Sequence, residues 1–186
     1  PSISRDESKV ADYIEAQLSS FGLNPSRQAN NLWCIAPDFS SDKPTLLLNS
    51  HIDTVKPANG WTFDPFTPPQ EDDRIYGLGS NDAGASVVAL TAAFRHLCDV
   101  ERNYNLILLL SCEEEVSGRN GIEAALPLLP KIDVAIVGEP TGMHPAIAEK
   151  GLMVLDGEIK GVSGHAARNE GVNAIYRAME VVNTLR

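Results

Sequence analysis

The feature that most constrains the fold is a set of short, almost purely apolar runs spaced along the chain. Leu106–Leu110 contains only leucine and isoleucine, and similar runs occupy residues 46–48 and 134–137. Runs of this length without polar alternation are typical of strands buried on both faces. Because helical patterns separate them, at residues 83–100 and 121–129, the sequence predicts an α/β fold with a central, mostly parallel β-sheet and helices on both faces.

Further elements are predicted around these strands. Ser4-x-x-Glu7 has the pattern of a capping box, and the apolar residues after it recur at helical spacing, so we expect a helix that ends at Gly22. Residues 32–36 are expected to form another strand. Residues 56–73 form a long, Pro-rich loop whose aromatic residues favour a packed conformation.

After Pro140 the pattern changes. Leu152–Lys160 is predicted to be a more exposed strand, and the apolar spacing from Val172 to Val182 predicts a final helix. We therefore expect two domains. Residues 1–146 would be a catalytic, metal-binding domain, and residues 147–186 the beginning of a smaller α+β lid or dimerisation domain.

Composition excludes several classes of protein. The 15 basic and 25 acidic residues give a net charge of 15 − 25 = −10, which argues against a nucleic-acid partner. No apolar run approaches the roughly 20 residues of a membrane span. The three cysteines are scattered without zinc-type spacing, which favours reduced thiols in a cytoplasmic protein.

Polar residues follow each of the three apolar runs. His51 and Asp53 follow the first, the glutamates 113–115 the second and Glu139 the third, while Asp82 lies in a Gly-rich turn before a helix. Ligands of open α/β sheets bind beyond the carboxyl ends of the strands, so these groups are expected to meet at one edge. One imidazole and several carboxylates suit zinc or a similar divalent ion.

Each group also has an ordinary interpretation. His51 is compatible with a polar strand end, the glutamates with a solvated helix start, and Asp82 with a helix cap. Glu139 is compatible with a plain loop entry, and His165 with a surface turn. The joint pattern favours a metal site, because the ordinary explanations would have to place four ligand-type groups at one sheet edge by accident.

The motifs resemble those of the acetylornithine deacetylase / succinyl-diaminopimelate desuccinylase / carboxypeptidase G2 family of di-zinc hydrolases. The matching segments, in family order, are Ser50-His51-Ile52-Asp53, Gly79-Ser80-Asn81-Asp82, Glu113-Glu114-Glu115-Val116, Gly138-Glu139-Pro140-Thr141 and Gly161-Val162-Ser163-Gly164-His165. They cover essentially the whole chain. The resemblance implies a zinc-exopeptidase-like catalytic domain followed by a lid.

The resemblance also implies a role for each matching residue. His51 and Glu139 would bind one metal, Glu115 a second, and Asp82 both, after a cis Asn81–Asp82 peptide. Asp53 would orient His51. Aligning the motif on Val116 makes Glu114 the general base, although Glu113 stands where the family has Asp and a register shifted by one stays open.

The remaining implications concern the whole protein. His165 would reach from the lid of a partner subunit to stabilise the oxyanion, which implies a homodimer. The cofactors would be two Zn²⁺, with Co²⁺ or Mn²⁺ as substitutes. The family's last His ligand matches neither His96 nor His144, and Pro1 is no native start. The chain is therefore expected to be a fragment with little activity of its own.

The activity implied by the resemblance is hydrolysis of the amide bond of a small N-acyl amino acid. N-acetylornithine or N-succinylornithine is favoured, with release of ornithine in arginine biosynthesis. The alternatives are a succinyl-diaminopimelate desuccinylase, an aminoacylase, a dipeptidase, or a metal-binding relative without catalysis. Retention of Glu114 favours an enzyme, because a relative without catalysis would be free to lose it.

Overall fold

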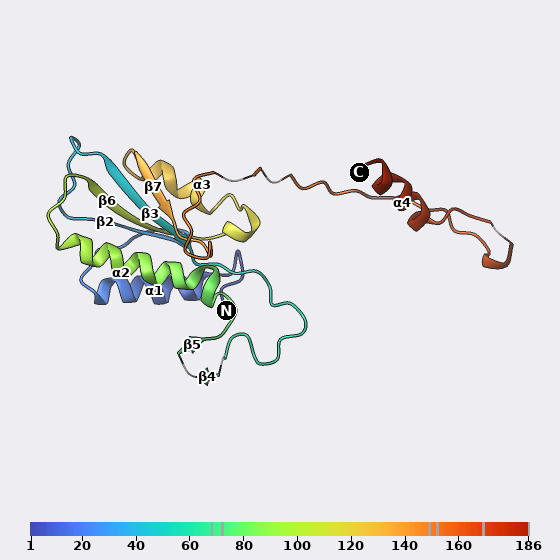
Figure 1. Cartoon of the computed structure of the whole chain (residues 1–186), viewed down its shortest axis with the longest axis horizontal. Coiled ribbons are helices and arrows are strands. Elements are labelled where there is room, and N and C mark those ends of the chain that lie inside the picture. Colours follow the sequence, from blue (N-terminus) through green and yellow to red (C-terminus); the bar gives the residue numbers. More distant parts are fainter. Residues whose placement is uncertain (68, 72, 149, 152, 169, 186) are drawn as a thin grey trace. The chain divides into compact units, whose positions relative to one another are not determined.

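The computed structural model describes residues 1–186 except 68, 72, 149, 152, 169 and 186. It divides the chain into two compact units, Pro1–Pro145 and Ala146–Arg186 (Figure 1). The first unit contains the predicted sheet and the groups expected at its edge.

The first unit is built on a five-stranded sheet. Its strands, in spatial order, are β1 (Ser26–Gln28), β2 (Asn31–Ile35), β6 (Asn105–Ser111), β3 (Thr45–His51) and β7 (Val134–Val137). β3 is parallel to both β6 and β7, whereas β2 is antiparallel to β1 and β6. Four of these five strands therefore share one direction, and the predicted mostly parallel α/β sheet is confirmed.

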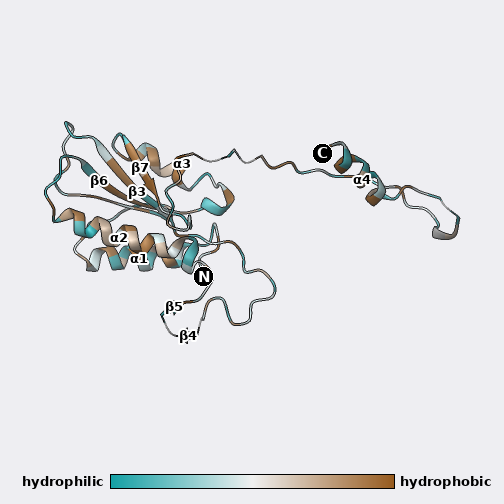
Figure 2. Cartoon of the chain, viewed as in Figure 1, coloured by the Kyte–Doolittle hydropathy of each residue, from teal (hydrophilic) through white to brown (hydrophobic). Residues whose placement is uncertain are grey.

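Helices cover both faces of this sheet (Figures 1 and 2). α1 (Ser8–Ser20) and α2 (Ser86–Cys98) pack on the face that carries Leu106, Leu108 and Leu110. α3 (Ile122–Ala125) packs on the opposite face, against Ile107 and Leu109. Successive side chains of a strand point to opposite faces, and both faces are covered, which explains why β6 has only apolar residues between Asn105 and Ser111.

The first helix corrects one prediction. α1 begins at Ser8, and neither Ser4 nor Glu7 makes a side-chain capping hydrogen bond to it. The Ser4-x-x-Glu7 pattern is therefore not a capping box here, because both side chains contact residues distant in the sequence instead. The predicted end is confirmed, since Gly22 adopts a left-handed φ of 78° just after the helix.

Short elements join the main ones. These are β4 (Gln70–Glu71), β5 (Arg74–Ile75), η1 (Ser80–Ala85), η2 (Glu114–Val116) and η3 (Leu126–Leu128). In the predicted Pro-rich loop, the ring of Phe63 makes edge-to-face contacts with Trp61 and Tyr76, each at 5.6 Å between centroids. Aromatic pairs in this arrangement stabilise a loop conformation. Trp61 and Phe63 thus pack as expected, whereas Phe66 is exposed.

The second unit contains η4 (Ala166–Arg168) and α4 (Ala174–Thr184). The final helix is confirmed, and the Asn173 side chain caps it by accepting a hydrogen bond from the Ile175 amide at 2.9 Å. The predicted strand over Leu152–Lys160 is not formed by residues 153–160, while Leu152 lies outside the described residues. A strand needs a hydrogen-bonded neighbour, and the only pairing described in this unit is the isolated bridge between Val162 and Val172.

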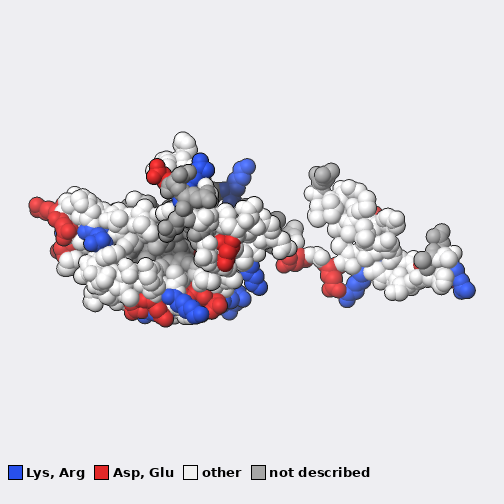
Figure 3. Space-filling view, turned by 90° about the horizontal axis from the view of Figure 1, so that it is seen from below, with Lys and Arg blue, Asp and Glu red and all other residues white. Residues whose placement is uncertain are grey.

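Two further observations concern the surface. No helix of the described residues is long and apolar enough to cross a membrane. On the face drawn in Figure 3, acidic and basic side chains form small separate groups on the first unit.

Candidate metal centre

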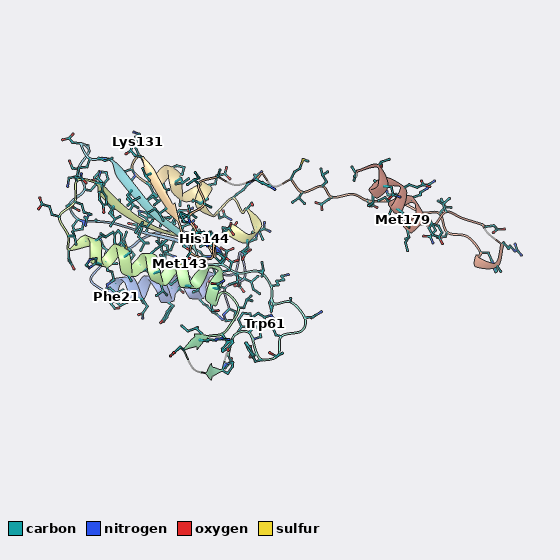
Figure 4. The ribbon with its side chains drawn as sticks, viewed as in Figure 1. Phe21, Trp61, Lys131, Met143, His144 and Met179 are labelled. Carbon is teal, nitrogen blue, oxygen red and sulfur yellow. The ribbon has the colours of Figure 1, made fainter. Side chains whose placement is uncertain are left out.

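The parallel register brings the ends of three strands to one edge. His51 of β3 lies opposite Ser111 of β6, and Asn49 lies opposite Val137 of β7. The Ser50 hydroxyl donates to the carbonyl oxygen of Gly138 at 2.9 Å, which links the β3 end to the loop after β7. Figure 4 shows Lys131 and His144 at opposite ends of β7, and the polar groups described below belong to the His144 end.

Three potential metal ligands converge at this edge. The Nε2 atom of His51 lies 3.0 Å from Asp82 Oδ1 and 3.7 Å from Glu139 Oε2. One donor atom from each of these residues falls within 4.8 Å of the others, a spacing that a single ion can bridge. His51 is buried, whereas the two carboxylates remain partly open to solvent. The structure therefore brings together three of the four metal ligands that the sequence predicts.

The hydrogen bond on the far side of the imidazole defines which nitrogen is available. Nδ1 of His51 lies 3.0 Å from the backbone carbonyl oxygen of Asp53 and 3.4 Å from its Oδ1 atom. A carbonyl oxygen only accepts hydrogen bonds, so Nδ1 carries the proton. In the neutral ring, Nε2 then presents its lone pair to Asp82 and Glu139, as a metal ligand must.

Burial and neighbouring charges shift the pKa values of the imidazole and of two carboxyl groups at this site. Burial works to lower the pKa of His51, but the Asp53 hydrogen bond and the charges of Glu139, Asp53 and Glu114 outweigh it and raise that pKa to about 9. Burial and neighbouring acids raise the pKa values of Glu115 and Glu139. These crowded negative charges would be relieved by a bound cation.

The glutamate turn lies beside this group. Glu114 Oε2 is 3.9 Å from His51 Nε2. The backbone amides of Glu114 and Glu115 donate to the two carboxylate oxygens of Asp53, at 3.0 and 3.2 Å. The Glu115 carboxylate is not among the three grouped ligands of the described residues, so its role as a ligand of a second metal stays a prediction.

Glu113 has a different environment from the next two glutamates. Its side chain is buried and accepts a hydrogen bond from Asn120 Nδ2 at 2.9 Å. Its backbone adopts a left-handed φ of 55°. This geometry directs Glu113 to a structural role in the turn and leaves Glu114 facing His51.

Asp82 differs in two respects from what the sequence suggested. Its side chain makes no capping hydrogen bond to α2, so the alternative of a simple helix cap is not supported. The cis peptide implied for Asn81–Asp82 lies one bond later, between Asp82 and Ala83.

A cavity of about 410 Å³ opens beside two of the three ligands, His51 and Glu139. Its lining joins the ends of β3, β6 and β7 to the start of α3, and includes His51, Glu114, Glu139, Ile122 and Glu123. Its size falls in the range of small-molecule sites. A small substrate can therefore reach the donor atoms from this side.

The structure places the remaining candidate in the second unit. His165 is exposed, and its Nδ1 accepts a hydrogen bond from the Ala167 amide at 3.2 Å. Its predicted role at the oxyanion stays a prediction. Sequence reasoning missed Ser4 and Glu7, whose side chains reach Asp53 and the Glu113 amide. The signal was present as Ser-x-x-Glu, but its partners lie far along the chain.

The donor set fits a divalent metal. One imidazole nitrogen with a fixed tautomer and two carboxylate oxygens are ligands that zinc and similar ions accept. A histidine that binds a metal usually donates its other ring N–H to a carboxylate or a carbonyl oxygen, and Asp53 offers both to Nδ1 of His51. The residues present therefore suit a metal centre, and the Glu114 carboxylate lies beside it.

The chain is similar to several known proteins. Residues 47–181 match the model of peptidase family M20/M25/M40. An acetylornithine deacetylase of Proteus mirabilis is 31% identical over 95% of this chain, which covers 47% of that relative. Among solved structures, an M20 family metallo-carboxypeptidase from Sulfolobus solfataricus is 26% identical, with a TM-score of 0.57 over 74% of this chain and 34% of that one.

A tripeptidase from Staphylococcus aureus, at 20% identity, shares the fold with a TM-score of 0.62 over 98% of this chain and 52% of its own. The chain thus spans about half the length of the relatives it matches. The family match covers most of the chain and includes all three grouped ligands. This chain belongs to peptidase family M20/M25/M40.

Proposed function

We propose that this chain carries the metal-binding part of a hydrolase that cleaves the amide bond of an N-acyl amino acid, with N-acetylornithine or N-succinylornithine as the favoured substrate. The observation that carries the proposal is the convergence of His51, Asp82 and Glu139 beside Glu114. Similarity to acetylornithine deacetylases supports the choice of substrate. Release of ornithine would give the reaction a place in arginine biosynthesis.

His51, Asp82 and Glu139 would hold the first metal. Asp82 would also serve a second metal together with Glu115, whose backbone is tied to Asp53. Zinc is the proposed metal, and Co²⁺ or Mn²⁺ would substitute for it. When bound, the ions supply a Lewis acid for the amide carbonyl and lower the pKa of water at the site.

Glu114 would transfer a proton from the attacking water to the leaving amine. Its carboxylate lies 3.9 Å from the metal-facing nitrogen of His51 and about half of its side chain is exposed to the open side of the site. A carboxylate in this position can take a proton from the attacking water and return it to the leaving amine. Asp53 would hold the His51 ring, since its carbonyl and carboxylate both face Nδ1.

The second unit would provide a lid and a dimer contact. The residues predicted to share one face of α4, including Ile175 and Met179, are exposed in the described chain. We propose that this unit contributes to a homodimer in which His165 stabilises the oxyanion in the partner's site. Sedimentation analysis of the natural protein would show a dimer, and a monomer at all concentrations would refute this part.

The test of the activity is amine release from N-acetylornithine and N-succinylornithine. The protein as it occurs naturally would be stripped of metal and then given Zn²⁺ or Co²⁺. We expect release only after metal is restored, and release about 10²–10⁴-fold slower from Glu114→Gln with the same metal content. Failure to release amine from either substrate by the metal-loaded protein would refute the proposed substrate.

A peptidase is the second candidate. The 26% identity to a metallo-carboxypeptidase favours it, because the same site would serve any amide carbonyl. Dipeptides in the same assay decide between the two. Faster hydrolysis of dipeptides than of N-acyl ornithines would move the assignment to a peptidase.

A further inference from the structure

Two side chains of the segment before α1 contact residues next to the metal centre, Asp53 and Glu113. The backbone of this segment is tied to the end of β3 by hydrogen bonds between Ser2, Ser4 and Thr54, at 2.9 and 3.1 Å. Ser4 Oγ donates to Asp53 Oδ2 at 2.7 Å. This short bond to a buried carboxylate is charge-assisted, a type stronger than most in proteins.

Asp53 is the point at which the contacts meet. It is 1% exposed. Its carboxylate accepts hydrogen bonds from Ser4 Oγ and from the backbone amides of Glu114 and Glu115. Its Oδ1 atom also lies 3.4 Å from His51 Nδ1. Burial works to raise the pKa of Asp53, but the hydrogen bonds from His51, Ser4 and the two amides lower it. Ser4 is the one hydroxyl donor among these contacts.

Glu7 holds the other side of the same turn. Its carboxylate is fully buried and accepts hydrogen bonds from Arg5 N at 2.7 Å, Asn30 Nδ2 at 3.0 Å and Glu113 N at 3.2 Å. A glutamate with a left-handed backbone, such as Glu113, needs local support. Glu7 supplies that support one residue before Glu114.

We propose that Ser4 and Glu7 are positioning residues of the metal centre. Ser4 acts through Asp53, which fixes both the His51 ring and the turn that carries Glu114 and Glu115. Glu7 acts through the Glu113 amide and fixes where that turn begins. The Ser-x-x-Glu pattern thus joins the start of the chain to the ends of β3 and β6. This inference rests on the proposed function, because it concerns the same site.

The main experiment compares Ser4→Ala with Ser4→Thr in the protein as it occurs naturally. Ser19→Ala is the matched control, because the Ser19 hydroxyl donates only to Glu15 O on the exposed side of α1. Zinc affinity would be measured by competition with a chelator. We expect Ser4→Ala to bind zinc about tenfold more weakly, because Asp53, the outer partner of His51, would be held less firmly, and Ser4→Thr to restore the affinity.

A second readout needs no metal. Amide hydrogen exchange of residues 113–116 in the metal-free protein would rise about tenfold in Ser4→Ala, because Asp53 would hold the Glu114 and Glu115 amides less firmly. Glu7→Gln should raise exchange in the same segment, since its new amide group cannot accept from three donors. Unchanged exchange and unchanged zinc affinity in Ser4→Ala, relative to Ser19→Ala, would overturn the proposal.

A double-mutant cycle separates positioning from a general structural effect. If Ser4 acts through Asp53, adding Ser4→Ala to an Asp53→Ala protein should change exchange and zinc affinity no further. An undiminished effect in that background would contradict the proposal. A wild-type protein that binds zinc but releases no amine would refute the proposed substrate alone, since neither readout requires turnover.

Discussion

The two units of this chain differ in how far their apolar side chains are buried. In the first unit, Leu106–Leu110 are all 0% exposed between helices on two faces of the sheet. In the second, α4 has no buried residue among those described, and Ile175 and Met179 are 68% and 56% exposed (Figure 4 shows Met179). The first unit therefore contains its own core, whereas the second presents an apolar face. The three grouped metal ligands, His51, Asp82 and Glu139, also belong to the first unit.

The largest effect should come from a change at the reacting edge of the first unit. Glu114→Gln keeps the size of the side chain and removes its ability to accept a proton. We expect turnover of the natural protein to fall by about 10²–10⁴-fold, the usual contribution of a general base, with metal content unchanged. Steady-state kinetics and metal analysis check this together. Full activity of the variant would show that another group takes the proton.

The next effect concerns the core itself. Leu108→Ala should reduce the free energy of unfolding by about 2–5 kcal/mol, because it leaves a cavity between β6 and the helices. The matched change Met179→Ala on exposed α4 should cost less than about 1 kcal/mol in this chain. Denaturant unfolding of both variants measures the difference. Equal losses would mean that α4 is buried in solution and would break the comparison.

A smaller effect is expected from the second unit's histidine. His165→Ala should lower kcat by about 10²-fold if the side chain stabilises an oxyanion, as removal of one such donor does elsewhere. Zinc affinity should stay at the wild-type value, since His165 is not among the grouped ligands. His96→Ala on α2 is the control. A loss of zinc affinity in His165→Ala would show that a residue of the second unit contributes to metal binding.

The mildest perturbation, which changes no residue, is a change of pH, and its effect should be confined to the first unit. The pKa of His51 is raised from 6.5 to about 9, so protonated His51 stabilises the metal-free fold below pH 6.5, and this contribution disappears as the pH rises to about 9. Zinc requires the neutral ring, so its binding should respond in the opposite direction. Apparent zinc affinity should increase up to about tenfold per pH unit until pH 9. A flat profile over this range would contradict the raised pKa.

The sequence predicted most of the first unit because its signals are local. The apolar run of β6, the helical spacing of α1 and the polar residues at strand ends each follow from neighbouring residues. Their meeting at one edge follows from parallel strand direction. His51 and Glu139 were brought together in this way, and Asp82 joins them from η1, just before α2.

What the sequence could not predict depends on contacts distant along the chain. Ser4 and Glu7 have the pattern of a helix cap, yet their partners Asp53 and Glu113 lie 49 and 106 residues away. The strand expected over Leu152–Lys160, which residues 153–160 do not form, depends on a neighbour that the local pattern does not specify. Local patterns thus predict elements, while long-range hydrogen bonds decide which side chains support the site.

The most direct test of the metal centre is anomalous diffraction at the zinc edge from crystals of the natural protein grown with zinc. The proposed ligand set predicts a peak in contact with His51 Nε2 and with carboxylate oxygens of Asp82 and Glu139. Refined distances near 2.0–2.2 Å to these atoms would establish the ligands. A fully occupied zinc elsewhere, with these three residues making no contact to it, would contradict the assignment.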